Sequence, residues 1–240
     1  MCPCSSSWTA EAASPLFGLL IFDCDGVLVD SERHATRIDV ALLAGCGIPI
    51  DEAEYVRRFT GIRHVDMVRE LERETGVILP ADHLPRVRAE LRAALTELGP
   101  ALAVPGIHAA LDGLGDRPRC VASGSTPEQL RHMLDQAGLW RHFAPHVFSS
   151  TLLDHGKPAP DVFLHAAAAL GVPAGRSLVI EDSVPGVVAG RAAGMTVIGF
   201  TGTARAADRR PERLRAAGAD CLLDRMADLP ALVARLEAGG

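Results

Sequence analysis

The sequence predicts an α/β fold: a doubly wound parallel sheet with a small helical domain inserted after the first strand. Two observations lead to this prediction. Short apolar runs alternate with helical patterns, and the long stretch between the first two runs has few strand signals. The runs are LLIFD, CVASG, HVFSS, LVIED, TVIGF and CLLD, at residues 19–23, 120–124, 146–150, 178–182, 196–200 and 221–224. Alternating strands and helices are typical of a parallel sheet with helices on both faces.

Helix signals follow two of these strands. Thr126 and Gln129 have the spacing of a capping box, and Gly138 is a suitable end for the helix that follows. Ser183 can cap a second helix that runs toward Gly194. Both helices therefore begin directly after a predicted strand, as the alternating topology requires.

The stretch 32–99 is rich in Arg and Glu and has helical periodicity. Leu84, Val87, Leu91 and Leu95 recur at spacings of three and four residues, which predicts one apolar helix face. The segment GPALAVPG at 99–106 returns the chain to the sheet. We therefore expect a loose N-terminal tail at 1–15, an α/β core at 16–31 and 100–240, and a helical insertion at 32–99.

Composition narrows the function classes. The net charge of −6 argues against binding to nucleic acid, which needs clustered Lys and Arg. The six cysteines form no CxxC pair and have no zinc-ligand spacing, which is typical of free thiols in a reducing compartment. The N-terminal tail lacks the basic start of a signal peptide, and no apolar run is as long as a membrane span. We expect a cytoplasmic protein, no membrane partner and a monomer.

The first strand ends in an unusual pair of acids. Asp23 and Asp25 are two residues apart, so an extended chain points both carboxylates to one side. Gly26 then permits a sharp turn. Two loop acids without a function would give the same pattern, so the pair alone does not decide the question.

The other strand ends carry groups that suit a phosphate. Ser123, with the backbone amides of Gly124 and Ser125, precedes a helix N-terminus, where anions bind favourably. Lys157 lies in a turn fixed by two prolines and can neutralise a phosphoryl group. A helix cap and a surface lysine are the simpler interpretations of each segment taken alone.

The fourth strand adds two acids, Glu181 and Asp182, to the pair after the first strand. Carboxylates this close repel one another unless a cation lies among them. Oxygen ligands of this kind suit Mg²⁺. This interpretation makes Asp23 the nucleophile and Asp25 the proton donor and acceptor, with Mg²⁺ and Lys157 relieving the repulsion.

Four segments resemble, in order and spacing, the motifs of the haloacid dehalogenase (HAD) superfamily: DCDGVLVDSE, VASGS, GKPAPDVF and VIEDSVPGVVAGRAAGM. The resemblance spans about residues 16–205 and implies a HAD-like Rossmannoid core. It also implies that Asp23 attacks phosphorus to form an aspartyl-phosphate, while Asp25 protonates the leaving group and then activates water.

The same resemblance implies the surroundings of the reacting groups. Mg²⁺ would be held by the Asp23 carboxylate, the Asp25 backbone carbonyl and Asp182, with Glu181 assisting. Ser123 and Lys157 would bind the phosphoryl oxygens. Because Asp25 is not an alanine, the resemblance favours phosphoryl transfer over dehalogenation.

The insertion resembles the helical cap of the subfamily that includes β-phosphoglucomutase, phosphoglycolate phosphatase and sugar-phosphate phosphatases. The segment FTGIRHVD at 59–66 corresponds to the substrate-specificity loop of that subfamily. We therefore expect Arg63 and His64 to contact the distal end of a small phosphorylated metabolite. Surface polar residues between two helices are the alternative interpretation.

The sequence leaves more than one reaction open: a phosphatase, a mutase or a signalling role. Mutases of this subfamily usually carry a His ten residues after the second aspartate, where this chain has Ala35 and a His one position earlier, His34. This favours a phosphatase for a sugar phosphate or sugar-acid phosphate, such as 6-phosphogluconate or a hexose phosphate, over a mutase. A phospho-Asp signalling receiver domain is a remote alternative, because receivers carry their acid pair before the phosphorylated strand and have no insertion after the first strand.

Overall fold

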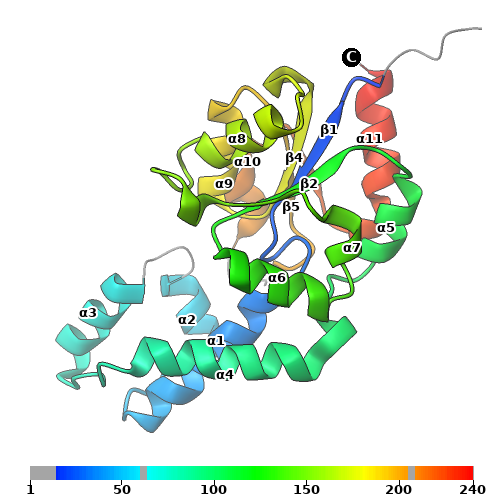
Figure 1. Ribbon diagram of the computed structural model, residues 1–240. Coiled ribbons are helices and arrows are strands. Elements are labelled where there is room, and N and C mark those ends of the chain that lie inside the picture. Colours follow the sequence, from blue (N-terminus) through cyan, green and yellow to red (C-terminus); the bar gives the residue numbers. More distant parts are fainter. Residues whose placement is uncertain (1–14, 60–63, 205–208, 240) are drawn as a thin grey trace, which may run out of the picture.

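The fold is a six-stranded parallel sheet with helices on both faces and a separate group of helices beside it (Figure 1). The computed structural model describes residues 15–59, 64–204 and 209–239. The strand order is β3-β2-β1-β4-β5-β6. The strands are β1 (Leu19–Phe22), β2 (Arg119–Ser123), β3 (Val147–Ser149), β4 (Ser177–Glu181), β5 (Thr196–Phe200) and β6 (Cys221–Leu223). The predicted α/β fold class and its six strands are confirmed.

Side chains alternate between the two faces of the sheet along each strand, and helices cover both faces, so both are buried. On β1, Leu20 and Phe22 belong to one apolar cluster, and Leu19 and Ile21 belong to the other. The first face is covered by α5 (Ile107–Gly113), α6 (Pro127–Gln136), α7 (Trp140–Phe143) and α11 (Leu229–Ala238). The second face is covered by α8 (Asp161–Ala169), α9 (Val184–Ala192) and α10 (Arg210–Ala216).

The two predicted helix starts are confirmed. The Thr126 side chain accepts a hydrogen bond from the backbone N–H of Gln129, which completes the capping box of α6. The Ser183 side chain accepts one from the N–H of Gly186 at the start of α9. Short 3₁₀ turns complete the core: η1 (Gly99–Leu102), η2 (Ser150–Leu152), η3 (Ala174–Arg176) and η4 (Met226–Asp228).

The segment between β1 and β2 begins with four helices that lie to one side of the sheet in Figure 1. They are α1 (Ser31–Gly45), α2 (Glu52–Phe59), α3 (His64–Thr75) and α4 (His83–Leu98). They have an apolar cluster of their own, built around Leu43, Phe59, Met67 and Leu71. Leu95 of α4 instead joins the cluster under the sheet, so this helix connects the two parts. The exact division into domains stays a prediction.

None of the helices in the described part of the chain has the length and apolar character of a membrane span.

The close packing of α9 on the sheet generates a prediction about stability. A Cβ atom on Gly190 would lie 2.7 Å from Cγ2 of Val197 on β5. We expect Gly190→Ala to lower the free energy of unfolding by about 1–3 kcal/mol, because valine side chains on a buried strand have little room to move. Denaturant unfolding would measure this change.

Gly45→Ala is the matched control, because a Cβ there meets nothing within 4 Å and the residue lies in the last turn of α1. This variant should be neutral or up to about 1 kcal/mol more stable, through helix propensity alone. Equal effects of the two substitutions would contradict the packing argument.

Candidate active site

The candidate site lies where the carboxyl ends of β1, β2 and β4 meet. Phe22 of β1 pairs with Val121 of β2 and with Ile180 of β4, so the three strands end side by side. The backbone N–H of Asp23 donates to the carbonyl of Ile180 at 3.0 Å, which fixes Asp23 beside β4. In open parallel sheets, ligands bind outside the carboxyl ends of the strands, at the point where the strand order reverses.

Lys157 joins the three strand ends. Its Nζ donates to Oδ1 of Asp23 and to Oε2 of Glu181, both at 2.7 Å, and to the carbonyl of Ala122 at 3.1 Å. Only 10% of the Lys157 side chain is exposed, and the two carboxylates are buried as deeply or more so. Removing the cation would leave two buried carboxylates without their partner.

The buried charged groups shift one another's pKa values. Burial raises the pKa of Asp23 above its usual range; the positive charge of Lys157 opposes this, while the neighbouring Glu181 and Asp25 carboxylates add to it. Burial also tends to lower the pKa of Lys157, but Asp23 and Glu181 outweigh it and the pKa of the ammonium rises. Lys157 is therefore a permanent positive charge beside Asp23.

Asp25 lies beside two hydroxyl groups. Its Oδ1 accepts from Oγ of Ser31 at 2.5 Å, and its Oδ2 accepts from Oγ of Ser125 at 2.7 Å. Ser31 is the first residue of α1, so Asp25 is connected both to the inserted helices and to the loop after β2. The two hydroxyls fix the orientation of the carboxylate.

The predicted phosphate-binding loop follows β2. Ser123 is buried at the end of the strand, and its Oγ accepts from the backbone N–H of Ser125 at 3.2 Å. Gly124 between them is exposed. The loop leads into the capped N-terminus of α6, the kind of position at which backbone N–H groups receive an anion.

Gly26 allows a close backbone approach in the site. Its φ is +79°, a left-handed conformation that favours glycine, and a Cβ there would lie 2.1 Å from Oδ2 of Asp182. The turn after Asp25 therefore brings the backbone directly against the carboxylate of Asp182. A side chain at this position would displace that carboxylate.

The three acids Asp23, Glu181 and Asp182 each place an oxygen so that all these oxygens lie within 4.8 Å of one another. Such a set of buried, hard oxygen donors fits Mg²⁺. Both oxygens of Glu181 already accept hydrogen bonds, one from Lys157 and the other from the N–H and Oγ of Ser183. These contacts favour a role for Glu181 in holding Lys157, and its predicted role at the ion stays a prediction.

Arg210 is a site residue that the sequence did not indicate. Its Nη1 donates to Oδ2 of Asp182 at 2.6 Å and to Oγ1 of Thr203 at 2.9 Å, and its Nη2 lies 3.2 Å from Oε2 of Glu32. Thr203 in turn donates to the carbonyl of Gly26 at 2.8 Å. Burial raises the pKa of Asp182; Glu32 adds to this increase, and Arg210 opposes it. No motif marks Arg210, because its carboxylate partners, Asp182 and Glu32, are 28 and 178 positions away in the sequence.

A cleft of about 270 Å³ opens between the inserted helices and the core. Arg210, Thr203 and Glu32 line it near Asp182, and Ala35 lies along its wall. His64 also lines it, at the start of α3, whereas Arg63 lies outside the described residues. Its other lining residues are Asp30, Arg33, Thr36, Asp39, Tyr55, Val56, Phe59 and Val87.

Comparison with known proteins identifies the family. Residues 17–194 match the family model of the haloacid dehalogenase-like hydrolases. The chain is 33% identical over 183 residues to the 6-phosphogluconate phosphatase of Escherichia coli (strain K12), covering 75% of this chain and 81% of that protein. It is 32% identical over 183 residues to hexitol phosphatase B of the same strain, covering 74% and 81%.

A solved structure supports the same family. A haloacid dehalogenase-like protein of Agrobacterium tumefaciens superposes with a TM-score of 0.83 at 40% identity, covering 92% of this chain and 99% of that one. The ordered motifs, the sheet edge that gathers them and these similarities lead to one conclusion: the chain belongs to the haloacid dehalogenase-like hydrolases and is an enzyme.

Proposed function

We propose that this enzyme is a Mg²⁺-dependent phosphatase that hydrolyses a small sugar phosphate or sugar-acid phosphate through an aspartyl-phosphate intermediate. The observation that carries the proposal is the contact of Lys157 with Asp23 at the edge where the three buried carboxylates meet. A lysine beside a carboxylate nucleophile supplies positive charge where a phosphoryl group would arrive. Bound Mg²⁺, held by Asp23, the Asp25 carbonyl and Asp182, would neutralise further negative charge.

The first step forms a bond between an Asp23 carboxylate oxygen and phosphorus, and breaks the bond between phosphorus and the ester oxygen. Asp25 gives its proton to the departing oxygen. Asp25 then takes a proton from water, whose oxygen attacks the same phosphorus, and inorganic phosphate leaves Asp23. Ser123, Gly124 and Ser125 receive the phosphoryl oxygens, and Ser31 and Ser125 keep Asp25 aimed at the reacting atoms.

The cleft supports a polyhydroxylated substrate. Its lining combines charged groups near Asp182 with His64 and Tyr55 on the inserted helices. The phosphatases named above act on 6-phosphogluconate and on hexitol phosphates, as their names state. We infer that 6-phosphogluconate or a hexose phosphate fits the cleft, with Arg63 and His64 at its distal end.

Hydrolysis is favoured over the mutase reaction by one residue of the cleft. A mutase must hold its phosphorylated intermediate for a second sugar hydroxyl, and the relevant position on α1 is Ala35, which carries no proton donor or acceptor. Water is therefore the expected acceptor of the phosphoryl group.

Replacing the nucleophile tests the mechanism. We expect Asp23→Asn to lower turnover by more than about a thousandfold, because an amide cannot form the aspartyl-phosphate. Phosphate release and circular dichroism would be measured together. Asp154→Asn, an exposed acid near Lys157 in the sequence, is the control and should keep wild-type activity. Retained activity in Asp23→Asn would refute the assignment.

Metal removal and a substrate panel test the reaction. Phosphate release from 6-phosphogluconate, hexose phosphates, phosphoglycolate and an aryl phosphate should require Mg²⁺ and should stop with a chelator. A sugar acid or hexose phosphate should have the highest kcat/KM. Conversion of β-glucose 1-phosphate to glucose 6-phosphate without phosphate release would instead establish a mutase.

The contact between Gly26 and Asp182 generates a third test. We expect Gly26→Ala to lower kcat/KM at least about tenfold and to raise the Mg²⁺ concentration that the enzyme requires, because the new methyl group displaces the Asp182 carboxylate. Gly171→Ala is the control: φ is +67° there, but nothing lies within 4 Å of the added Cβ. That variant should lose about 1 kcal/mol of stability and no activity. An unchanged Mg²⁺ requirement in Gly26→Ala would contradict the argument.

A further inference from the structure

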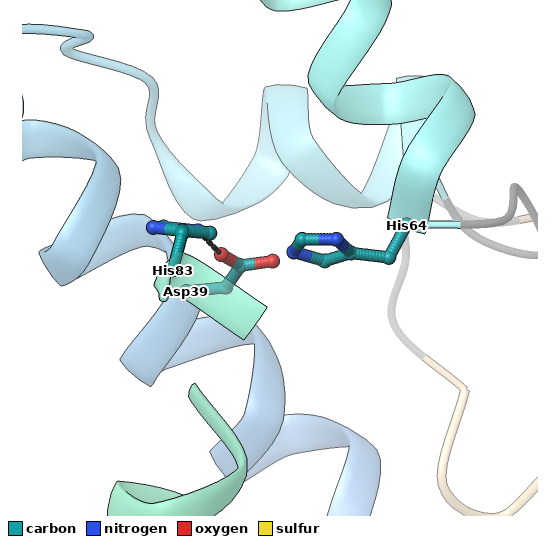
Figure 2. A group of neighbouring side chains, drawn as sticks. All are labelled: Asp39, His64 and His83. Carbon is teal, nitrogen blue, oxygen red and sulfur yellow. Dashed lines mark hydrogen bonds and ion pairs between the residues drawn. The ribbon is translucent and has the colours of Figure 1, made fainter. Parts of the chain in front are cut away.

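A second cluster of metal-ligating side chains lies within the inserted helices, away from the carboxylates of the active site. It consists of Asp39 on α1, His64 at the start of α3 and His83 at the start of α4 (Figure 2). Each residue offers a ligand atom, and these atoms all lie within 4.8 Å of one another. Asp39 and His83 are each 3% exposed. Three helices thus direct one carboxylate and two imidazoles to one buried point.

Asp39 is held firmly in this cluster. Its Oδ1 lies 2.7 Å from Nε2 of His83, and its Oδ2 accepts from the hydroxyl of Tyr55 at 2.5 Å. The Tyr55 hydroxyl thus donates to the carboxylate oxygen that His83 does not contact. In protein metal sites, outer hydrogen-bond partners orient the ligands in the same way as Tyr55 orients Asp39 here.

His64 has no such partner. Its ring stacks on that of His83 with centroids 5.5 Å apart and points toward Asp39 (Figure 2). Its Nε2 is buried and is without a hydrogen bond, a condition that no other buried side-chain N or O atom in the described residues shares. A buried polar atom without a partner costs free energy. The hydrogen bonds that join Asp39 to His83 and Tyr55 satisfy those three residues, but they leave the buried Nε2 of His64 without a partner.

We propose that Asp39, His64 and His83 bind a divalent transition-metal ion of the Zn²⁺ type, distinct from the Mg²⁺ of the active site. Two imidazole nitrogens and one carboxylate suit such an ion and not Mg²⁺, which prefers oxygen ligands. Ligand atoms around tetrahedral Zn²⁺ lie about 2.0–2.1 Å from the metal, and hence roughly 3.3 Å from one another. Small side-chain rotations would move His83 away from Asp39 and His64 toward it.

The charge of the cluster is compatible with this ion. Zn²⁺ binds the neutral form of imidazole, so each histidine would contribute a nitrogen without adding charge. The one negative charge of Asp39 offsets part of the charge of the ion. Asp39 and His64 also border the cleft, so a fourth position on the metal can take water.

A bound metal would cross-link α1, α3 and α4 through its three ligands. This inference does not depend on the proposed phosphatase activity. Its test uses the full chain without a histidine tag, freed of metal with a chelator and kept in excess Mg²⁺. Titration with Co²⁺ should give one equivalent of binding, with the strong visible absorption of four- or five-coordinate Co²⁺ that has nitrogen ligands. Zn²⁺ should displace it and raise the unfolding temperature.

His64→Gln is the decisive variant, because its Nε2 makes no hydrogen bond that the metal-free protein could lose. It should weaken Co²⁺ binding by more than about tenfold, abolish the stabilisation by Zn²⁺, and unfold at the wild-type temperature without metal. His165→Gln, an exposed histidine of α8, is the control and should behave as wild type. His83→Gln should also lose the absorption, although it breaks a buried hydrogen bond.

Two results would overturn the proposal. One is the absence of the nitrogen-ligand absorption in the wild-type protein. The other is binding that persists in His64→Gln but is lost in Asp182→Asn, which would assign the ion to the active-site carboxylates. Neither readout requires turnover, so the outcome is independent of whether the enzyme is a phosphatase.

Discussion

The active-site edge depends on one buried ammonium group, that of Lys157. Asp23, Glu181 and Asp182 bring three carboxylates together at the ends of two adjacent strands, and such a group repels itself when it is buried. Lys157 contacts two of the three and also the carbonyl at the end of β2. One side chain thus balances charge and links the ends of β1, β2 and β4. Removing a partner from such a buried pair costs about 3–5 kcal/mol.

A second cation, Arg210, stabilises the opposite side of the same group. It contacts Asp182 directly and reaches Glu32 on α1, while Thr203 links it to the carbonyl of Gly26. The two cations have different tasks. Lys157 lies against Asp23, at the end of β1, whereas Arg210 connects Asp182 to the first inserted helix. The position of that helix and the position of the Asp182 carboxylate are therefore coupled through one guanidinium group.

The inserted helices combine rigidity with a polar interior. Leu43, Met67 and Leu71 give them an apolar cluster of their own, and Leu95 anchors α4 to the core. Beside this cluster they bury Asp39 and His83, and Asp39 lines the cleft that leads toward Asp182. Burying a carboxylate is costly unless hydrogen bonds or a cation satisfy it. This polar cluster is thus a property of the inserted helices and is separate from the carboxylates at the sheet edge.

The sequence by itself determined the strands, two helix caps and the polar side chains at the strand ends, because these depend on local patterns. Apolar runs that end in Asp23, Ser123 or Glu181 carry both the strand and its polar end within a few residues. Only the tertiary structure decided which charges meet. Arg210 and Glu32 are 178 positions apart, and His83 and Asp39 are 44 apart, so no local spacing could pair them. Likewise, the hydrogen bonds of Glu181 to Lys157 and Ser183 depend on how the strands and loops pack. Residue type and spacing indicate which groups reach an edge or a helix end, whereas their partners are set by the burial and distances that folding creates.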